Sequence, residues 1–246
     1  MQIQAGVDFY ERDLVVKTLS TRDELEKAYR LRHKVFAETL RWVPPTEDGQ
    51  EVDMYDLWGT SIGLVRHDGQ LLGLARLLPA SGEFMLERDL RMLLPQGHVL
   101  RKEQDTAEIT RLALDPAIRD KSLSARLMLT LIKGIYHWAL VRDVRYFYLE
   151  VEYRFFRVLH GLGIPCDPLG LPVALPPAGA LSVAATMDIA KCETVLAQKR
   201  PLLMEWMATT VTAEGKVVRG RRSQSREVEL GFPSQARQSS FLLPAA

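Results

Sequence analysis

The order in which strand-type and helix-type patterns alternate along this chain constrains its fold more than any other feature. Short runs rich in β-branched and aromatic residues predict strands, and longer runs with helical apolar spacing predict helices. Strands are predicted over residues 14–17, 61–67, 70–78, 108–114, 144–151 and 181–189. Helices are predicted over residues 20–36, 122–142, 153–162 and 191–207. This order predicts an α/β sandwich built around a mixed sheet.

The composition is that of one globular unit followed by a basic tail. The chain has 246 residues, of which 47% are hydrophobic, and this is enough to bury a full core. Residues 1–214 are predicted to form a single domain. Residues 215–246 carry six basic residues against two glutamates, together with much Ser, Gln, Gly and Pro. That segment is predicted to be a poorly packed, solvated basic tail.

Several classes of protein are disfavoured by what the sequence lacks. The formal net charge of +1 argues against a general nucleic-acid binder. No stretch of about 20 residues is apolar enough to span a bilayer, and the N-terminus lacks a signal-peptide pattern. The two cysteines, Cys166 and Cys192, are too few for a disulfide framework or a zinc site. No nucleotide-phosphate, nucleophile-elbow or histidine metal motif is present. A cytoplasmic protein without a membrane partner is expected.

Arginines and acids are concentrated in the N-terminal half, and Arg76 is the most informative of them. It lies inside an apolar strand, where a guanidinium needs a partner, and Glu51, Asp53 and Asp56 are candidates. The cluster has two interpretations: a salt-bridge network that fixes the first helix on the sheet, or a cleft for a cationic ligand. The three acids could also hold Mg²⁺ or Ca²⁺, but their stretch contains no glycine and faces arginines, so no metal site is predicted.

An ordered set of motifs connects this cluster to a known family. The set is Arg32-x-x-x-Phe36, Trp42, Glu51-x-Asp53-x-x-Asp56, Gly73-x-x-Arg76-Leu-Leu-Pro, Met85-Leu86 and Glu108-x-x-Arg111. In this order, over roughly residues 14–170, it resembles the acyl-homoserine-lactone synthases, the LuxI-type autoinducer synthases. The resemblance implies a GNAT-like N-acyltransferase fold: a three-layer α/β sandwich with a central mixed, twisted sheet.

The resemblance also implies a reaction. The amine of S-adenosylmethionine would attack an acyl thioester on acyl carrier protein, and ring closure would release methylthioadenosine and a quorum-sensing lactone. No cofactor is implied, because S-adenosylmethionine is a substrate and the phosphopantetheine belongs to the carrier protein. Glu108 and Arg111 match catalytic positions. The residues that match the S-adenosylmethionine site are Arg32, Phe36, Trp42, Glu51, Asp53, Asp56 and Arg76.

Two roles are open for Glu108. The attacking amine must be neutral, and free α-amino groups titrate near ~8, so a carboxylate could remove the proton directly or through water. Glu108 could equally form a structural ion pair with Arg111. The thioester oxyanion is expected to bind backbone N–H groups of the strand over residues 108–114. Glu108→Ala is expected to reduce turnover and leave the fold stable.

The segment before the long helix bears on the acyl donor. Coenzyme-A-dependent GNAT enzymes usually have [QR]-x-x-G-x-[GA] there, whereas this chain has serines, Ser122 and Ser124, at both glycine positions. Close backbone approach to a pyrophosphate is then harder, which fits a carrier-protein donor. Alternatively, Ser122 simply caps the helix. An acidic carrier protein would dock on basic residues, for which the candidates are Arg119, Lys121, Arg126, Lys133, Arg142, Arg145, Arg154 and Arg157.

The acyl chain needs an apolar pocket. Met128, Trp138, Leu149 and Phe155 are candidates to line it, although the same residues would also make an ordinary core. In the family that this chain resembles, a Thr on this strand accompanies 3-oxo acyl chains, and Leu149 stands at the nearest position. An unsubstituted or unusual acyl group is therefore expected.

Two other functions remain open from the sequence. One is a long-chain N-acyl amino acid synthase that uses the same donor to acylate a free amino acid. The other is a non-catalytic GNAT-fold module that binds a metabolite in the cleft.

Overall fold

The fold is a large sheet with helices on both faces. The computed structural model describes residues 7–220 and 226–227. The strands are β1 (Asp8–Glu11), β2 (Leu14–Leu19), β3 (Thr60–Arg66), β4 (Leu71–Pro79), β5 (Thr106–Leu114), β6 (Tyr146–Glu152), β7 (Asp167–Pro168), β8 (Val173–Leu175), β9 (Ala180–Asp188), β10 (Thr209–Val211), β11 (Val217–Arg219) and β12 (Arg226–Glu227). The helices are α1 (Arg22–Arg32), α2 (Lys121–Val141), α3 (Tyr153–Gly161), α4 (Ile189–Lys199) and α5 (Pro201–Ala208).

The sheet is mixed, as predicted. Its strand order is β12-β11-β10-β1-β2-β3-β4-β5-β6-β9-β7, and β8 also pairs with β9. The β5–β6 pair is parallel, because α2 crosses over between these strands, while β4 pairs with β5 and β9 with β6 in the antiparallel sense. The parallel pairing covers only Thr106–Ile109 of β5 and Tyr146–Leu149 of β6. Beyond the pair Ile109–Leu149, the described residues of β5 and β6 are not paired with each other.

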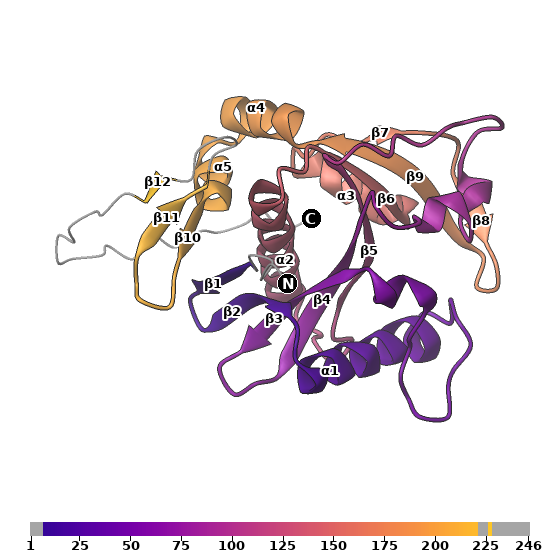
Figure 1. Cartoon of the computed structure of the whole chain (residues 1–246), viewed down its shortest axis with the longest axis horizontal. Helices are drawn as coiled ribbons and strands as arrows, with labels where there is room; N and C mark the ends of the chain where they lie inside the picture. The colour runs from indigo at the N-terminus through magenta and orange to yellow at the C-terminus, as the bar shows by residue number, and fades with distance from the viewer. Residues whose placement is uncertain (1–6, 221–225, 228–246) are drawn as a thin grey trace.

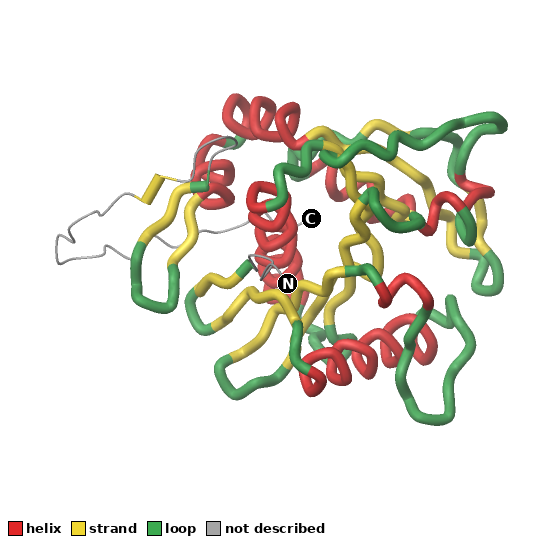
Figure 2. The backbone as a smooth tube through the Cα atoms, in the orientation of Figure 1, coloured by secondary structure: helices red, strands yellow, loops and turns green. Residues whose placement is uncertain are grey.

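Alternation along β4 assigns its side chains to two layers. Ala75 and Leu77 belong to the main core, which α2 covers. Leu74 and Leu78 belong to smaller apolar clusters on the opposite face, and α1 packs on Leu74. Figures 1 and 2 show α1 and α2 on opposite sides of the central strands. The predicted three-layer α/β sandwich is confirmed.

A local signal sets the start of the first helix. Thr21 accepts a hydrogen bond from the backbone of Glu24, whose carboxylate accepts in return from the N–H of Thr21, so the predicted capping box is present. After Arg32 the backbone continues as a π-helical segment, His33–Thr39. The predicted turn at residues 68–69 is also present, and Gly69 has a φ of 83° there.

Three points of the predicted secondary structure need correction. The single helix over residues 191–207 is wrong, because α4 and α5 are separate helices that meet at Arg200, immediately before Pro201. The capping residue of α2 is Asp120, not Ser122: Asp120 Oδ1 accepts a 2.6 Å hydrogen bond from the N–H of Leu123. Strands β1, β7, β8, β10, β11 and β12 were not predicted, since each is four residues or shorter.

The predicted boundary between residues 214 and 215 falls inside a hairpin. β10 and β11 pair from Thr209 with Arg219 to Val211 with Val217, around a turn that contains Gly215 at a φ of 75°. Gly220 then lies against α2, where an added Cβ would come within 2.5 Å of Leu140 Cδ1. The rest of the predicted tail, apart from residues 226–227, lies outside the described residues.

Two further findings concern membrane segments and the cysteines. Within the described ranges, no helix is both long enough and apolar enough to cross a bilayer. Cys166 and Cys192 are buried free thiols, and burial raises the pKa of each.

Candidate active site

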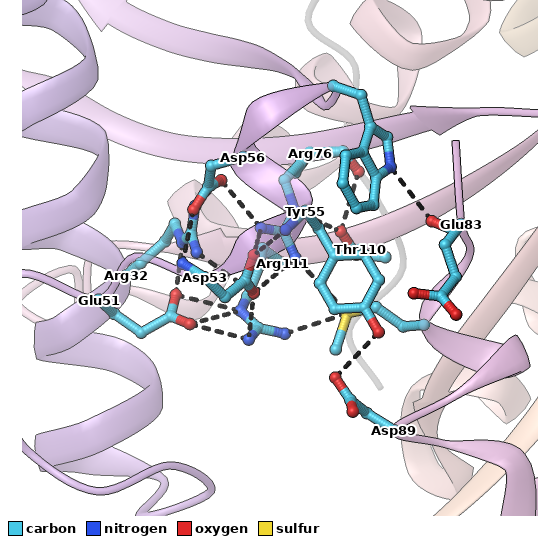
Figure 3. Close-up of polar contacts among 12 residues, drawn as sticks. Arg32, Glu51, Asp53, Tyr55, Asp56, Arg76, Glu83, Asp89, Thr110 and Arg111 are labelled. Atoms are coloured by element: carbon cyan, nitrogen blue, oxygen red, sulfur yellow. Dashed lines mark hydrogen bonds and ion pairs between the residues drawn. The ribbon is translucent and has the colours of Figure 1, made fainter. Parts of the chain in front are cut away.

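Three arginines and three carboxylates interlock on the face of the sheet that carries α1, as Figure 3 shows. We call the group the arginine–carboxylate network: Arg32, Arg76, Arg111, Glu51, Asp53 and Asp56. Arg32 Nε lies 2.5 Å from Glu51 Oε2, and Arg32 Nη1 lies 2.6 Å from Asp56 Oδ1. The guanidinium comes from the last turn of α1, and its acidic partners come from the loop that follows.

Arg76 reaches the same loop from the middle of β4. Its guanidinium donates to both oxygens of Asp53, at 2.9 Å for the bond from Nη2 to Oδ2, and to Asp56 Oδ1 at 2.8 Å. Its Nε donates to Thr110 Oγ1 at 3.0 Å. All three predicted partners of the cluster therefore lie in the network, but Glu51 pairs with other arginines. The described side chains form the predicted salt-bridge network, which links the end of α1 to β4.

Arg111 enters the network because β5 carries a bulge. The β4–β5 register passes from the pair Arg76–Thr110 to the pair Leu74–Ala113, so two residues of β5 oppose one residue of β4. Arg111 has a φ of 51° in this bulge. Its guanidinium donates to Glu51 Oε1 at 2.8 Å and to Asp53 Oδ2 at 3.1 Å. It also lies 5.3 Å from the ring centroid of Phe36.

The guanidinium groups of the network hold Glu51 and Asp56 in the ionised form. Burial alone would raise the pKa of Glu51, but the hydrogen bonds and charges of Arg111 and Arg32 lower it to about 2. Arg32 and Arg76 likewise lower the pKa of Asp56 against its burial. Each carboxylate therefore faces guanidinium groups. Among the residues that the structure describes, no group of three or more His, Cys, Asp or Glu side chains is arranged to hold a metal ion.

Glu108 lies on the same face of the sheet but outside the network. The suggested ion pair with Arg111 is absent from the contacts among the described residues. Instead, Glu108 is fully buried and accepts hydrogen bonds from the backbone N–H groups of Met85, at 2.6 Å, and Leu86, at 2.9 Å. Burial raises the pKa of Glu108 to about 7, although these bonds and the charges of Lys102 and Arg76 oppose the shift.

Aromatic side chains border the network on two sides. Phe36 and Trp42 are in contact, with ring centroids 5.8 Å apart, and both belong to the apolar cluster beneath α1. Tyr55 stacks edge-on against Trp58 at 5.6 Å, and its hydroxyl donates to Asp89 at 2.9 Å. Sequence reasoning missed this Tyr55 contact, although its position between Asp53 and Asp56 was a usable signal.

An apolar cavity of about 70 Å³ lies on the opposite face of the sheet. Strands β5, β6 and β9 and helices α2 to α5 contribute to its lining, which includes Ile109, Leu149, Val151, Phe155, Met187 and Leu196. Of the four predicted pocket residues, Leu149 and Phe155 line this cavity. Met128 and Trp138 do not; Trp138 packs against Phe147 in the core, with ring centroids 6.3 Å apart.

Solved structures with the same fold define the class of this protein. The synthase LasI aligns with a TM-score of 0.64 and 19% identity, covering 72% of this chain and 90% of that one. The CoA-dependent acyl-homoserine lactone synthase BjaI aligns with a TM-score of 0.61 and 25% identity, covering 72% and 82% of the two chains. The mixed, twisted sheet and its flanking helices are those of a GNAT-like acyltransferase.

Sequence comparison then identifies the family. The family model described as autoinducer synthase matches residues 16–195. The acyl-homoserine-lactone synthase of Agrobacterium fabrum is 33% identical over 178 residues, covering 71% of this chain and 84% of that protein. That of Rhizobium radiobacter is 34% identical over 155 residues, covering 61% and 73%. The chain belongs to the autoinducer synthase family, and the activity of its relatives makes it an acyltransferase that synthesises acyl-homoserine lactones.

Proposed function

We propose that this enzyme transfers an acyl group from acyl carrier protein to the amine of S-adenosylmethionine. The carboxylate of the acylated product then displaces the sulfonium, which closes the lactone and releases methylthioadenosine. One observation carries this proposal. The arginine–carboxylate network and the apolar cavity lie on opposite faces of β5 and β6, at the point where the pairing of these two strands ends.

The two most accessible members of the network suit the amino-acid part of S-adenosylmethionine. Asp53 and Arg111 have side chains that are 21% and 13% exposed, whereas Arg32 and Arg76 are fully buried. If the ion pair between Asp53 and Arg111 opens, the two side chains can bind a zwitterionic ligand, which carries one positive and one negative group. Asp53 would then bind the ammonium group and Arg111 the carboxylate, while Phe36 and Trp42 lie beside them.

The bulge in β5 suits the thioester carbonyl. A regular antiparallel ladder uses every second N–H of a strand toward each neighbour. Here Arg111 and Leu112 of β5 have no register partner in β4. The register between β5 and β6 ends at Ile109 among the described residues. We expect the backbone N–H groups of this bulge to stabilise an oxyanion in the gap between β5 and β6. The acyl chain would extend from there past Ile109 and Leu149 into the cavity.

The start of α2 favours acyl carrier protein over coenzyme A as the donor. The first turn of a helix attracts phosphate groups through its free N–H groups. Here the carboxylate of Asp120 already accepts one of these N–H groups, and its negative charge repels a pyrophosphate. Phosphopantetheine on a carrier protein does not bring the adenosine pyrophosphate of coenzyme A to this point. The neighbour BjaI is CoA-dependent by its name, so the donor is the part of the proposal that needs a direct test.

An assay with paired donors tests the proposal. The purified chain is given S-adenosylmethionine with the same acyl group attached either to acyl carrier protein or to coenzyme A, and mass spectrometry follows the products. We expect acyl-homoserine lactone and methylthioadenosine in equal amounts, with a higher kcat/KM for the carrier-protein donor. Parallel reactions contain free amino acids in place of S-adenosylmethionine. An acylated amino acid without methylthioadenosine would contradict the proposal.

The start of α2 offers a matched variant for the donor. Asp120→Asn keeps a capping side chain and removes the charge, so the helix should keep its N-terminus. We expect this change to raise kcat/KM for the coenzyme A donor and to leave the carrier-protein donor within twofold. An equal effect on kcat/KM for both donors would show that Asp120 does not discriminate between them.

A further inference from the structure

A second carboxylate lies next to Glu108, and no step described so far uses it. Glu150 is in β6, two residues after Tyr148, which the parallel register places opposite Glu108. Because strand side chains alternate, Glu150 is on the same face as Tyr148 and Glu108, whereas Leu149 and Val151 face the apolar cavity. Glu150 is also the first residue of β6 beyond its pairing with β5. It therefore lies at the gap where the thioester is proposed to sit.

One carboxylate oxygen of Glu150 is buried and accepts no hydrogen bond from the described residues. Its Oε2 is inaccessible to solvent and has no hydrogen-bond partner among the described residues. Buried carboxylate oxygens normally have such a partner, because removal from water costs free energy. The oxygens of Glu108 differ in this respect, since each accepts from a backbone N–H of the loop at residues 85–86. Of the two acids, Glu150 is the one with a free acceptor for a ligand N–H.

The surroundings of Glu150 also suit a proton acceptor. Burial raises its pKa well above the ordinary value and the charge of Glu108 raises it further, while Arg111 and Arg76 oppose these effects. A carboxylate with a raised pKa exchanges protons with an ammonium group more readily than an ordinary one. Glu108 has a different structural task. It fixes the backbone of Met85, whose sulfur lies 3.5 Å from the guanidinium groups of both Arg76 and Arg111.

On the basis of the proposed function, we infer that Glu150 takes the proton from the attacking amine and that Glu108 positions the loop beside the network. An N–H bond of the substrate ammonium breaks, and its proton passes to Oε2 of Glu150. The freed electron pair on nitrogen forms the new C–N bond as the thioester C–S bond breaks. The sulfur leaves with the C–S electrons and takes the second proton lost by nitrogen, which gives a thiol. Glu150 then passes its proton to water that enters the site as the products leave.

Substitution of Glu150 by Gln tests this inference with little change of shape. Thiol release is measured in the full-length chain while S-adenosylmethionine is varied at a saturating level of the acyl donor. We expect kcat to fall by about 10²–10⁴-fold, the usual contribution of a general base, with KM for S-adenosylmethionine within about threefold. Glu152→Gln, two residues further along β6, is the control and should retain wild-type kinetics. A Glu150→Gln chain with kcat within threefold of wild type would overturn the inference, as would a change confined to KM.

A second pair of variants keeps the test decisive if Glu150→Gln does not fold. Glu150→Asp and Glu150→Asn have the same size and differ in the acid alone, and thermal unfolding establishes that each is native. We expect kcat of the Asp variant to exceed that of the Asn variant at least tenfold, and equal values would overturn the inference. The wild-type chain separates this test from the proposed function. If it forms no lactone with any donor, the proposed function fails; if it turns over and Glu150→Gln does too, only the role of Glu150 fails.

Discussion

At the residue scale, each carboxylate of the arginine–carboxylate network neutralises more than one guanidinium. Asp56 lies 2.6 Å from Arg32 and 2.8 Å from Arg76, and both arginines are fully buried. Asp56→Ala would remove one partner from each of these buried charges, leaving Arg32 paired with Glu51 and Arg76 paired with Asp53. We expect it to lower the free energy of unfolding by about 3–5 kcal/mol, the usual cost of breaking a buried pair. Urea unfolding measures the loss, and the exposed Glu47→Ala in the same loop should change stability by no more than about 0.5 kcal/mol.

The raised pKa of Glu108 makes stability depend on pH. Burial raises the pKa to about 7, so between pH 4.5 and 7 the native state holds a proton that the unfolded state has lost. This contribution to stability is complete below about pH 4.5 and disappears as the pH rises through 7. We expect Glu108→Gln, which stays neutral, to gain stability relative to wild type from pH 5 to pH 8. Urea unfolding at these pH values checks this, and a constant difference would contradict it.

The same contacts revise the expectation for Glu108→Ala. The methyl group would leave the buried N–H groups of Met85 and Leu86 without acceptors, at about 1–3 kcal/mol for each. We therefore expect this variant to lose stability as well as activity. Unfolding and turnover should be measured together, because a loss of activity alone would not then assign a catalytic role.

The members of the network could be predicted from the sequence, but one of its pairings could not. A buried Arg76 near three acids required partners, and the ordered motifs supplied the other arginines. Strand alternation, however, places Arg111 on the face opposite Thr110 in a regular strand. The bulge in β5 returns it to the network, where it pairs with Glu51 and not with Glu108. No local pattern in the sequence marks this bulge. Glu150 did have a signal, as a lone acid among apolar and aromatic residues of a predicted strand.

At the element scale, α2 packs closely on the sheet through a glycine. An added Cβ at Gly134 would lie 2.6 Å from Val16 Cγ1 and 3.3 Å from Ile62 Cγ2, side chains of β2 and β3. Gly134→Val should therefore push α2 away from the sheet and lower stability by about 1–3 kcal/mol. The thermal unfolding midpoint reports the change. Gly161→Val at the end of α3 is the matched control, because no described atom lies within 4 Å of its added Cβ; a similar loss there would refute the packing argument.

The long elements were predictable, and the short ones depended on tertiary contacts. α2 and strands β3 to β6 and β9 appear close to their predicted positions because each carries a periodic pattern over seven or more residues. Strands such as β10 and β11 have three residues each, too few to show a period. They form because β10 pairs with β1 and β11 pairs with β10. The break between α4 and α5 was marked in the sequence by Pro201.

At the scale of the whole molecule, the sheet separates an apolar compartment from a charged one. Leu149 faces the cavity, and the next residue, Glu150, faces the side that carries the network. Leu149→Trp should fill cavity space and shift product synthesis toward shorter acyl chains, with total turnover retained on the shortest. Mass spectrometry of products from a panel of chain lengths tests this. Val158→Trp, at an exposed position of α3, should leave the product pattern unchanged.

The first and last parts of the described domain are in contact, and this affects folding during synthesis. β1 pairs with β10 through Tyr10 and Val211, and Glu11 accepts from Trp206 of α5 at 3.1 Å while contacting Lys133 of α2 at 2.6 Å. During synthesis the outer edge of β1 has no strand to pair with until some 200 later residues have been added, about 10–40 s at ribosomal rates. An open edge of this kind invites association with other chains. The nascent protein is therefore exposed to aggregation, and dependent on chaperones, throughout the interval before β10 has been added.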